Sequence, residues 1–296
     1  MRIMPHIPVL LNEVIEYLQP KNGKRFIDAT VNGGGHAKEI LRHLPKDGIL
    51  IGIDRDKNIL ECTAQQFEED KRFKPIHGNF KDIAKLTRKY ARSWDGILFD
   101  LGMSSLQLGK SGRGFSFMKN EPLDMRFDAS QTLNAAQVVN QWPEHELVDA
   151  FSKYGEERYA KRIARAICES RRKIPVKTTT DLVNIIRSAV PWSYFRNSSI
   201  HPATRVFQAL RITVNDELNS LARGLEAAWT ILEPGGRMAV ISFHSLEDRI
   251  VKHQFKDFKK SSNKSIILTK KPLRPGNDEI RTNARARSAK LRVIQK

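Results

Sequence analysis

Residues 25–36 have the sequence Arg-Phe-Ile-Asp-Ala-Thr-Val-Asn-Gly-Gly-Gly-His, and this stretch decides the fold. A short apolar run ends in Asp28, a glycine turn follows, and residues 36–44 place apolar side chains at helical spacing. Glycines let a backbone approach a ligand closely, and the start of the following helix presents free N–H groups. The spacing is not G-x-G-x-x-G, which weakens the case for a dinucleotide. We predict a strand, a ligand-binding turn and a helix.

The alternation of strand and helix continues along the next seventy residues. The pattern predicts strands at 49–54, 73–79 and 94–102, with helices at 56–67 and 82–90. Such alternation favours a parallel sheet that is covered on both faces. A strand of the same type follows at 236–243. Two further candidates, 265–269 and 290–294, would complete the sheet as a hairpin with an antiparallel strand.

After Gly102 the alternation stops for about a hundred residues, and helical patterns take over. Helices are expected at 156–173 and at 180–190, where Thr180 is a candidate cap. The periodic stretch from Pro202 to Leu232 is too long for one ordinary helix, so we expect a bend or two helices. The fold class is therefore α/β with an inserted all-helical domain. The predicted domains are 1–105 and 213–296, which form one sheet, and the insert 106–212.

The charge of the chain points to a polyanionic partner. Lys and Arg number 51 against 33 Asp and Glu, a net charge of +18. Residues 249–296 alone hold 15 basic and 3 acidic residues, which favours a phosphate-binding surface over a merely solvated one. The two cysteines, Cys62 and Cys168, exclude a disulfide framework. No apolar run is long enough to span a membrane, and we expect a cytoplasmic protein.

Acidic residues stand at the ends of three predicted strands: Asp28, Asp54 and Asp100. Asp54 is placed to bind both hydroxyls of a ribose, although a cap for the helix at Asp56 is the alternative. Carboxylates crowded together repel one another, so a cationic ligand would relieve them. S-adenosylmethionine carries a sulfonium, an ammonium and a ribose, whereas a nicotinamide dinucleotide brings pyrophosphate. Phe80 either flanks a purine or belongs to the core.

Many separate motifs, in one order, resemble the RsmH (MraW) family of bacterial 16S rRNA cytosine-N4 methyltransferases. The motifs are DATVNGGGH at 28–36, IDRD at 53–56, DLGMSSLQ at 100–107, RGFSF at 113–117, PLDMR at 122–126, YGEER at 154–158, HPATR at 201–205, SFHSLEDR at 242–249 and RARS at 285–288. The resemblance implies a class I (Rossmann-like) methyltransferase fold, S-adenosylmethionine as cofactor, and a cytidine of the ribosomal decoding centre as target. Carried over by position, the cofactor contacts would be Gly34, Gly35, His36, Asp54, Phe80, Asp100 and Gln107.

The chemistry of methyl transfer to cytosine N4 selects Asp100 as the catalytic candidate. The N4 lone pair is delocalised into the ring, so an acceptor for an N4–H bond would localise electron density there; Asp100 or a nearby carbonyl could serve. Methylation at C5 would instead need a nucleophilic thiolate. Neither Cys62 nor Cys168 ends a strand, and both are expected to pack.

Rival functions remain at this stage. A DNA amino-methyltransferase should carry a Pro-Pro-Tyr signature, where this chain has Asp100-Leu-Gly-Met. A non-catalytic ribosome-assembly factor would not need acidic strand ends and a glycine turn together. A dehydrogenase is the third alternative.

The candidate substrate contacts lie outside the glycine turn. They are Arg113, Phe115, Phe117, His244, Arg285 and Arg287. The two phenylalanines could stack on a splayed-out base or merely anchor their loop. His244 is expected to be structural or to position the base. The histidines show no metal-ligand spacing, so no catalytic metal is expected. The partner would be small-subunit rRNA or the small ribosomal subunit, and the sequence leaves the oligomeric state open.

Overall fold

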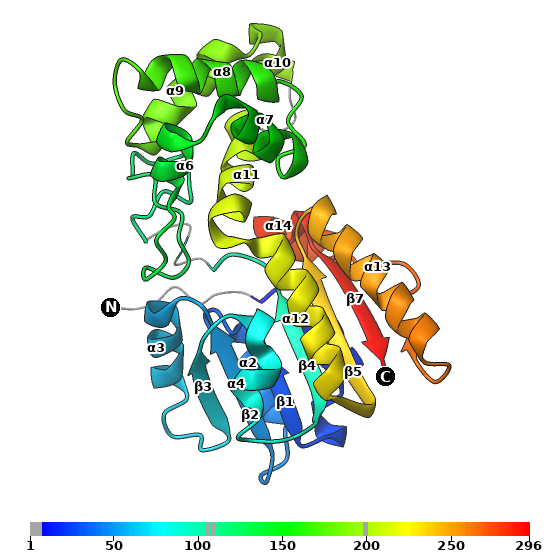
Figure 1. Ribbon diagram of the computed structural model, residues 1–296. Coiled ribbons are helices and arrows are strands. Elements are labelled where there is room, and N and C mark those ends of the chain that lie inside the picture. Colours follow the sequence, from blue (N-terminus) through cyan, green and yellow to red (C-terminus); the bar gives the residue numbers. More distant parts are fainter. Residues whose placement is uncertain (1–7, 105–106, 108–110, 198–200) are drawn as a thin grey trace. The chain divides into compact units, whose positions relative to one another are not determined.

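The computed structural model describes residues 8–104, 107, 111–197 and 201–296, which fall into two compact units (Figure 1). Unit 1 comprises Met1–Ser104 and Leu218–Lys296, and unit 2 comprises Ser105–Glu217. The predicted boundary at 105/106 falls on residues outside the described ones. The second boundary lies after Glu217 rather than at 212/213, because the preceding helix keeps its regular geometry until Asp216 turns left-handed (φ 49°).

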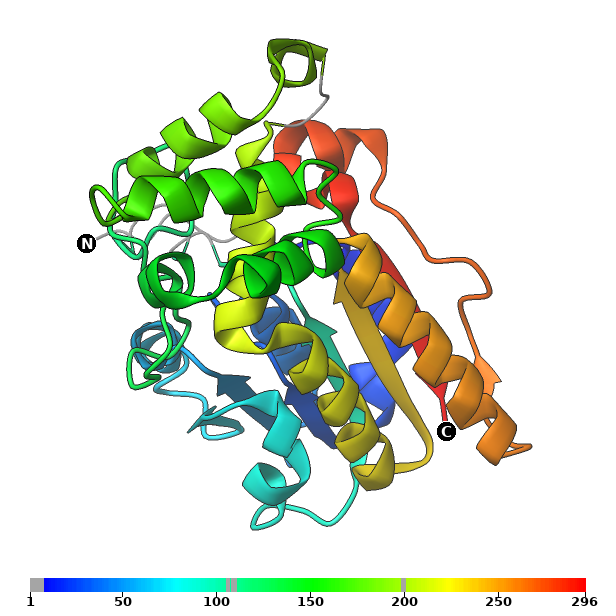
Figure 2. The ribbon, with the colours of Figure 1, turned by 45° about the horizontal axis from the view of Figure 1, so that its top comes forward.

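Unit 1 is built on a seven-stranded sheet with the order β3-β2-β1-β4-β5-β7-β6. The strands are β1 (Arg25–Asp28), β2 (Ile49–Asp54), β3 (Phe73–His77), β4 (Trp94–Asp100), β5 (Leu232–Ser242), β6 (Ile266–Ile267) and β7 (Lys290–Gln295). The first five are parallel, while β7 runs antiparallel to both β5 and β6 (Figure 2). The predicted parallel sheet and its antiparallel completion are confirmed.

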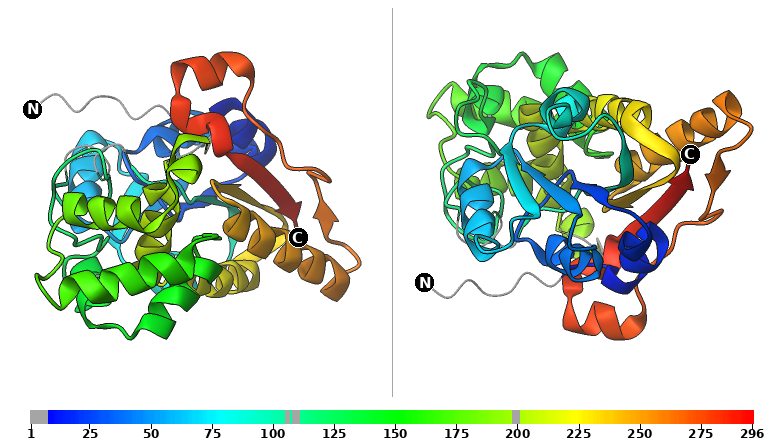
Figure 3. Two further views of the ribbon diagram at one scale, coloured as in Figure 1. Left: turned by 90° about the horizontal axis from the view of Figure 1, so that it is seen from above. Right: turned by 90° about the horizontal axis from the view of Figure 1, so that it is seen from below.

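Helices cover both faces of this sheet (Figure 3). One face packs against α1 (Leu11–Leu18), α2 (Gly35–His43) and α3 (Lys57–Gln66). The other face packs against α4 (Ile83–Thr87), α12 (Glu217–Ile231) and α13 (Ser245–Ser261). Short elements complete the unit: η1 (Pro20–Asn22), η2 (Phe80–Asp82), α14 (Asn277–Thr282) and η3 (Ala284–Ser288). Strands buried on both sides account for the nearly continuous apolar runs of the sequence.

Unit 2 is helical in its described part. Its helices are α6 (Ala135–Gln141), α7 (Glu144–Lys153), α8 (Ala160–Arg171), α9 (Thr179–Ala189), α10 (Trp192–Asn197) and α11 (Ala203–Asn215). The long periodic stretch from Pro202 is thus two helices, α11 and α12, as expected. No helix among the described residues has the length and apolarity that a membrane span requires.

One predicted helix cap was wrong. Thr178, not Thr180, caps α9, because its hydroxyl accepts the N–H of Asp181 while the Asp181 carboxylate accepts the N–H of Thr178. This reciprocal pair needs an acceptor side chain three residues after the cap. Thr180 has Val183 at that position.

Candidate functional site

Three buried carboxyl groups lie at the carboxyl edge of the unit 1 sheet. Asp28 is 1% exposed, Asp100 is 4% and Asp54 is 8%. Burial raises the pKa of Asp28 to about 8, and the charges of Asp100 and Asp54 add to the rise. Burial likewise raises the pKa of Asp54 to about 6. The three strand ends therefore crowd together and favour a cationic ligand over an anionic one.

Asp54 holds the backbone around the glycine turn. Its Oδ2 accepts the N–H of Asn32 (2.9 Å) and its Oδ1 accepts the N–H of Asp56 (2.8 Å). The cap of α3 is Asp56 itself, whose Oδ1 accepts the N–H of Asn58, so the alternative role of Asp54 as that cap is wrong. The N–H of Arg55 also bonds to this carboxylate, so about one of its four or so acceptor positions remains for a ligand such as a ribose.

The glycine turn needs a glycine at Gly34 for two separate reasons. Gly34 has φ 79°, a left-handed conformation that side chains rarely adopt. A Cβ there would also lie 2.9 Å from the ring of Phe67 and 3.0 Å from Thr63. Thr63 fixes the same turn by donating its hydroxyl to the carbonyl of Asn32. The turn is therefore rigidly set before α2 begins.

His36, the second residue of α2, is buried beneath the turn. Its Nε2 lies 3.0 Å from the carbonyl oxygen of Val9, and its Nδ1 lies 3.5 Å from Oδ2 of Asp100. Burial lowers the pKa of His36 to about 4, so the ring is neutral at physiological pH. Because a carbonyl only accepts, the single ring hydrogen is on Nε2, and the lone pair of Nδ1 faces Asp100.

Phe80 begins η2 and packs at the margin of the core. Its ring meets that of Phe99 edge to face at 5.5 Å, and a Cβ on Gly224 of α12 would lie 2.7 Å from it. The neighbouring Asn79 caps η2 and donates its amide to the hydroxyl of Ser220 (3.3 Å). These contacts support the core alternative, while the half-exposed ring leaves the purine contact a prediction.

The chain matches the MraW methylase family over residues 3–296. It belongs to this family. The ribosomal RNA small subunit methyltransferase H of Carboxydothermus hydrogenoformans is 48% identical and that of Syntrophotalea carbinolica is 47% identical. The alignment with the first covers 98% of this chain and 97% of the relative, and that with the second covers 99% and 98%.

Membership of the MraW methylase family confirms the resemblance noted in the sequence. Members of the family are S-adenosylmethionine-dependent methyltransferases, and the expected class I methyltransferase fold, with its helical insert, is confirmed.

In this MraW-family chain, the loop residues Arg113 and Phe115 support unit 2 from within. Arg113 donates through Nη1 to the carbonyls of Arg126 and Phe127, both at 3.0 Å. Phe115 is only 7% exposed and stacks on Phe127 with ring centroids 5.4 Å apart. Burial favours the alternative in which Phe115 anchors its loop, and it removes the exposed face that base stacking would need.

Phe117 and Gln107 also belong to unit 2. The Phe117 ring is half-buried, stacks on His201 at 4.8 Å and meets Phe207 edge to face at 5.4 Å. Burial lowers the pKa of His201, which disfavours a charge in this stack. The Gln107 side chain is buried, and its contact with the cofactor stays a prediction.

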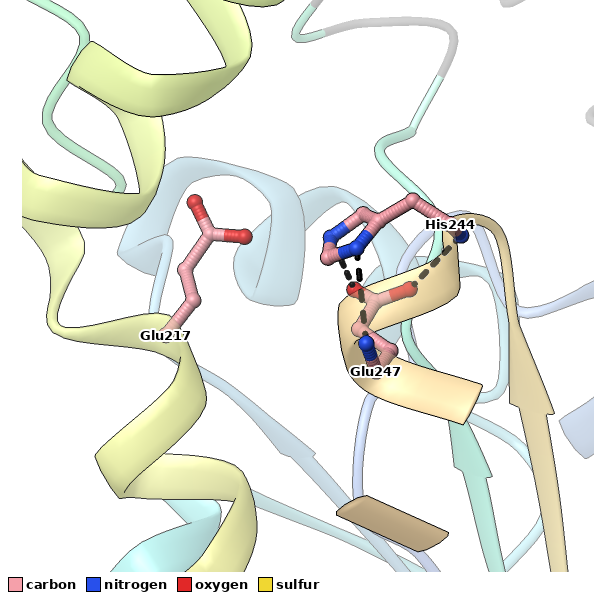
Figure 4. Close-up of side chains that lie close together, drawn as sticks. All are labelled: Glu217, His244 and Glu247. Atoms are coloured by element: carbon pink, nitrogen blue, oxygen red, sulfur yellow. Dashed lines mark hydrogen bonds and ion pairs between the residues drawn. The ribbon is translucent and has the colours of Figure 1, made fainter. Parts of the chain in front are cut away.

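His244 forms the cap of α13 (Figure 4). Its Nδ1 accepts the N–H of Glu247 (3.4 Å), and Glu247 Oε2 accepts the N–H of Phe243 (2.8 Å) and His244 (3.3 Å). The Nε2 atom lies 3.2 Å from Glu247 Oε1. These contacts support the structural alternative for His244, and a contact with the target base stays a prediction.

The two arginines predicted to contact RNA differ in exposure. Arg287 in η3 is exposed, whereas Arg285 is half-buried, and burial lowers its pKa. Ala286 and Ala289 are buried and attach this segment to the sheet. Both arginines stay predicted RNA contacts, with Arg287 the more accessible.

Sequence reasoning missed two residues that shape the site. The hydroxyl of Thr30 accepts the N–H of Asp100 (2.6 Å), and the Asn32 amide donates to the carbonyls of Thr30 (3.0 Å) and Gly102 (3.3 Å). Asn32 has a positive φ of 47°, for which asparagine is one of the better residues. An asparagine directly before three glycines was therefore a usable signal. Thr30 offered none.

Proposed function

We propose that this chain transfers the methyl group of S-adenosylmethionine to the exocyclic N4 of a cytidine in the decoding centre of 16S rRNA. The relatives at 47% and 48% identity are named as methyltransferases of small-subunit rRNA. The observation that carries the proposal is the cluster of buried carboxyls at the carboxyl edge, with Asp100 beside a neutral His36. A protein that only binds RNA would need neither the acidic strand ends nor the rigid glycine turn, so these features favour an enzyme over a non-catalytic assembly factor.

The donor set at this edge fits the cofactor. Raised pKa values at Asp28 and Asp54 mark a site that gains from a cation, and no Lys or Arg side chain acts on either group among the described residues. A sulfonium and an ammonium meet this need, whereas pyrophosphate would add repulsion. Gly34, Gly35, Asp54 and Asp100 would hold the group, which supplies an electrophilic methyl.

Asp100 would act on the target base. Its carboxylate accepts a hydrogen bond from N4–H, which localises the nitrogen lone pair for in-line attack. When N4 gains its methyl group, the N4–H proton passes to Asp100 and then to water, so the charge balances. No covalent bond between protein and base is required.

Helix α13 supplies a surface for the RNA backbone. Its acids Glu247 and Asp248 face inward, and Asp248 binds Arg292 (2.6 Å) and Lys290 (3.1 Å) of β7. Its exposed cations recur at intervals of three, four and three residues, which places them on one stripe about 15 Å long. They are Arg249, Lys252, Lys256 and Lys259. Such a stripe suits successive phosphates of an RNA strand.

The proposed function is tested by methylation in vitro followed by nucleoside analysis. Purified protein is incubated with isotopically labelled S-adenosylmethionine and small ribosomal subunits, or with naked 16S rRNA, from a strain lacking the corresponding gene. We expect N4-methylcytidine, identified against standards by chromatography and mass spectrometry. A C5-methylcytidine product or label in DNA alone would contradict the proposal, as would binding of the subunit without methyl transfer.

A further inference from the structure

The segment 8–10 connects two parts of unit 1 that are far apart in the sequence. The N–H of Leu10 donates to Oε1 of Glu279 in α14 at 2.8 Å, across 269 positions of the chain. One residue earlier, the carbonyl of Val9 accepts from Nε2 of His36 at 3.0 Å. Adjacent backbone groups thus join α14 to the helix that follows the glycine turn.

The backbone of this segment is strained at Leu10, so its contacts with the rest of unit 1 are needed to keep it in place. Leu10 is fully buried and adopts a left-handed conformation (φ 54°, ψ 37°), which is strained in a non-glycine residue. The carbonyl of Leu10 accepts the N–H of Val14 and begins α1. On the other side, Pro8 lies so close to Gly35 that a Cβ there would be 3.0 Å from its ring.

The position of the Val9 carbonyl determines which tautomer His36 adopts and therefore which ring nitrogen atom faces Asp100 with a lone pair. The Val9 carbonyl requires the ring hydrogen on Nε2, so the Nδ1 lone pair is the atom 3.5 Å from Asp100 Oδ2. If Val9 shifted, the imidazole would lose the bond that selects its tautomer and sets its ring plane. The Leu10–Glu279 bond is the contact that fixes this backbone from the α14 side.

We propose that Glu279 is a positioning residue for the cofactor end of the site, acting through Leu10 and Val9 on His36 and thereby on Asp100. The proposal rests on the proposed function only in placing the cofactor beside His36 and Asp100. It gives Glu279 a role in a segment otherwise dominated by basic residues. The role does not require the negative charge of Glu279. It requires an acceptor oxygen that reaches the N–H of Leu10.

Four variants separate reach from charge. Glu279→Ala removes the acceptor, Glu279→Asp keeps the charge but withdraws the oxygen by one methylene, and Glu279→Gln keeps an oxygen at the same reach. Asp278→Ala is the matched control, because Asp278 is the neighbouring acid on α14 and its side chain is almost fully exposed. Affinity for S-adenosylmethionine is measured by calorimetry on full-length protein whose folding is verified by its thermal transition.

We expect Glu279→Ala and Glu279→Asp to bind S-adenosylmethionine about two- to tenfold more weakly, the loss of one hydrogen bond. Glu279→Gln and Asp278→Ala should bind like the parent. Nitrogen chemical shifts of the His36 ring, measured without cofactor, report which ring nitrogen carries the hydrogen. We expect the Nε2–H tautomer in the parent and in Glu279→Gln, and a mixture of both tautomers in Glu279→Asp. If Glu279→Ala does not fold, the Asp and Gln variants decide the question.

Parental affinity and an unchanged His36 tautomer in Glu279→Asp would overturn the role of Glu279. Weak binding by Glu279→Gln would overturn it too, since charge rather than reach would then matter. Failure of the proposed function looks different, because the parent itself would then form no N4-methylcytidine while the four variants could still be ranked by cofactor affinity.

Discussion

The two edges of the unit 1 sheet carry aspartates in opposite electrostatic states. At the amino edge, Asp95 accepts the N–H groups of Lys24 (2.7 Å) and Arg25 (2.9 Å) and the guanidinium of Arg25 (3.0 Å). Burial by itself would raise the pKa of Asp95, but these hydrogen bonds outweigh burial and lower it. At the carboxyl edge, burial raises the pKa of Asp28 and Asp54.

The two edges differ in whether the protein itself supplies cations to their aspartates. Asp47 follows the same rule as Asp95, since a hydrogen bond from Lys24 lowers its pKa. Asp95 and Asp47 at the amino edge thus have cations supplied by the protein, and the half-buried Asp95 is the one expected to stabilise the fold. Among the described residues, no Lys or Arg side chain is a cause of the pKa shift of Asp28 or Asp54, so we expect these two acids to gain from a cationic ligand such as a sulfonium. Strand β4 joins the two edges, with Asp95 near its start and the buried Asp100 at its end.

The largest effect is expected from substitutions at the two ends of β4. Asp100→Asn should lower the rate of methyl transfer by about 10²- to 10⁴-fold, because the acceptor of the N4 proton is lost. Asp95→Asn should lower the unfolding temperature but leave the turnover of the folded enzyme unchanged. Both are measured with labelled methyl donor and by thermal unfolding. Equal loss of turnover in the two variants would break the comparison between the edges.

The next effect concerns RNA, with exposed lysines of the amino edge as the control. Replacing Lys252, Lys256 and Lys259 with Glu should reduce the steepness of the log–log plot of RNA affinity against salt by about two units. At 0.1 M salt this corresponds to a loss of affinity of about a hundredfold. The control reverses three exposed lysines that precede β1, β2 and β3. They are Lys21, Lys46 and Lys71.

Both triple variants change the net charge equally, so filter binding over a salt series separates a local surface from a general charge effect. Equal slopes for the two would mean that α13 is not a docking surface. Reversal of Arg287 alone should act in the same direction as the α13 variant but reduce the slope by less than one unit.

A smaller effect, on cofactor affinity, is expected from substitutions of the aspartates near the two ends of β2. Asp54→Ala should weaken cofactor binding by about ten- to a hundredfold, the loss of a charged acceptor. Because Asp54 is buried and holds Asn32 and Asp56, we also expect lower stability, which an exposed strand end would not show. Asp47→Ala is the control and should bind the cofactor normally. Calorimetry with unchanged affinity in folded Asp54→Ala would exclude Asp54 from the site.

The raised pKa values predict that cofactor binding releases protons. Folded Asp28 holds its proton up to about pH 8 and Asp54 up to about pH 6, whereas an unfolded aspartate loses it near 3.8. These two groups therefore stabilise the fold at low pH, and their contribution falls as pH rises. A bound cation favours the ionised forms, so affinity should rise with pH from 5 to 8, by less than about tenfold per unit for each proton released.

Calorimetry in two buffers of different ionisation enthalpy counts the released protons. Asp28→Asn should abolish the proton release near pH 8 and leave unchanged the release near pH 6, which comes from Asp54. His36 contributes nothing in this range, because its pKa is about 4. An affinity that falls as pH rises would contradict a cationic ligand at this edge.

The smallest effect is expected from the cysteines, which lie at neither edge. Cys62 is in α3 and Cys168 is in α8 of unit 2. Replacing both with Ala should leave methyl transfer to N4 intact, at a cost of about 1–3 kcal/mol in stability. A folded but inactive double variant would indicate covalent attack through a thiolate, and the product would then be methylated at C5.

Local sequence patterns were enough to predict that the acidic strand ends meet at the carboxyl edge of the sheet. Alternating apolar runs predicted β2 at residues 49–54, and parallel pairing brings Asp28 level with Gly52 and Leu98, so the acidic ends of neighbouring strands meet. These inferences hold because periodicity and strand ends are local properties. The family resemblance then added the chemistry that the acidic residues alone left open.

The hydrogen-bond and charge partners of the polar groups at both edges became known from the folded structure alone. Asp54 and Asp95 both accept backbone N–H groups, but Asp95 also accepts the guanidinium of Arg25, whereas Asp54 is only 8% exposed. Phe115 follows a glycine in a polar loop and is nevertheless buried. The Leu10–Glu279 bond joins residues 269 positions apart. A hydrogen bond depends on distance and direction in space, and no local pattern encodes a contact between segments that meet only when the chain folds.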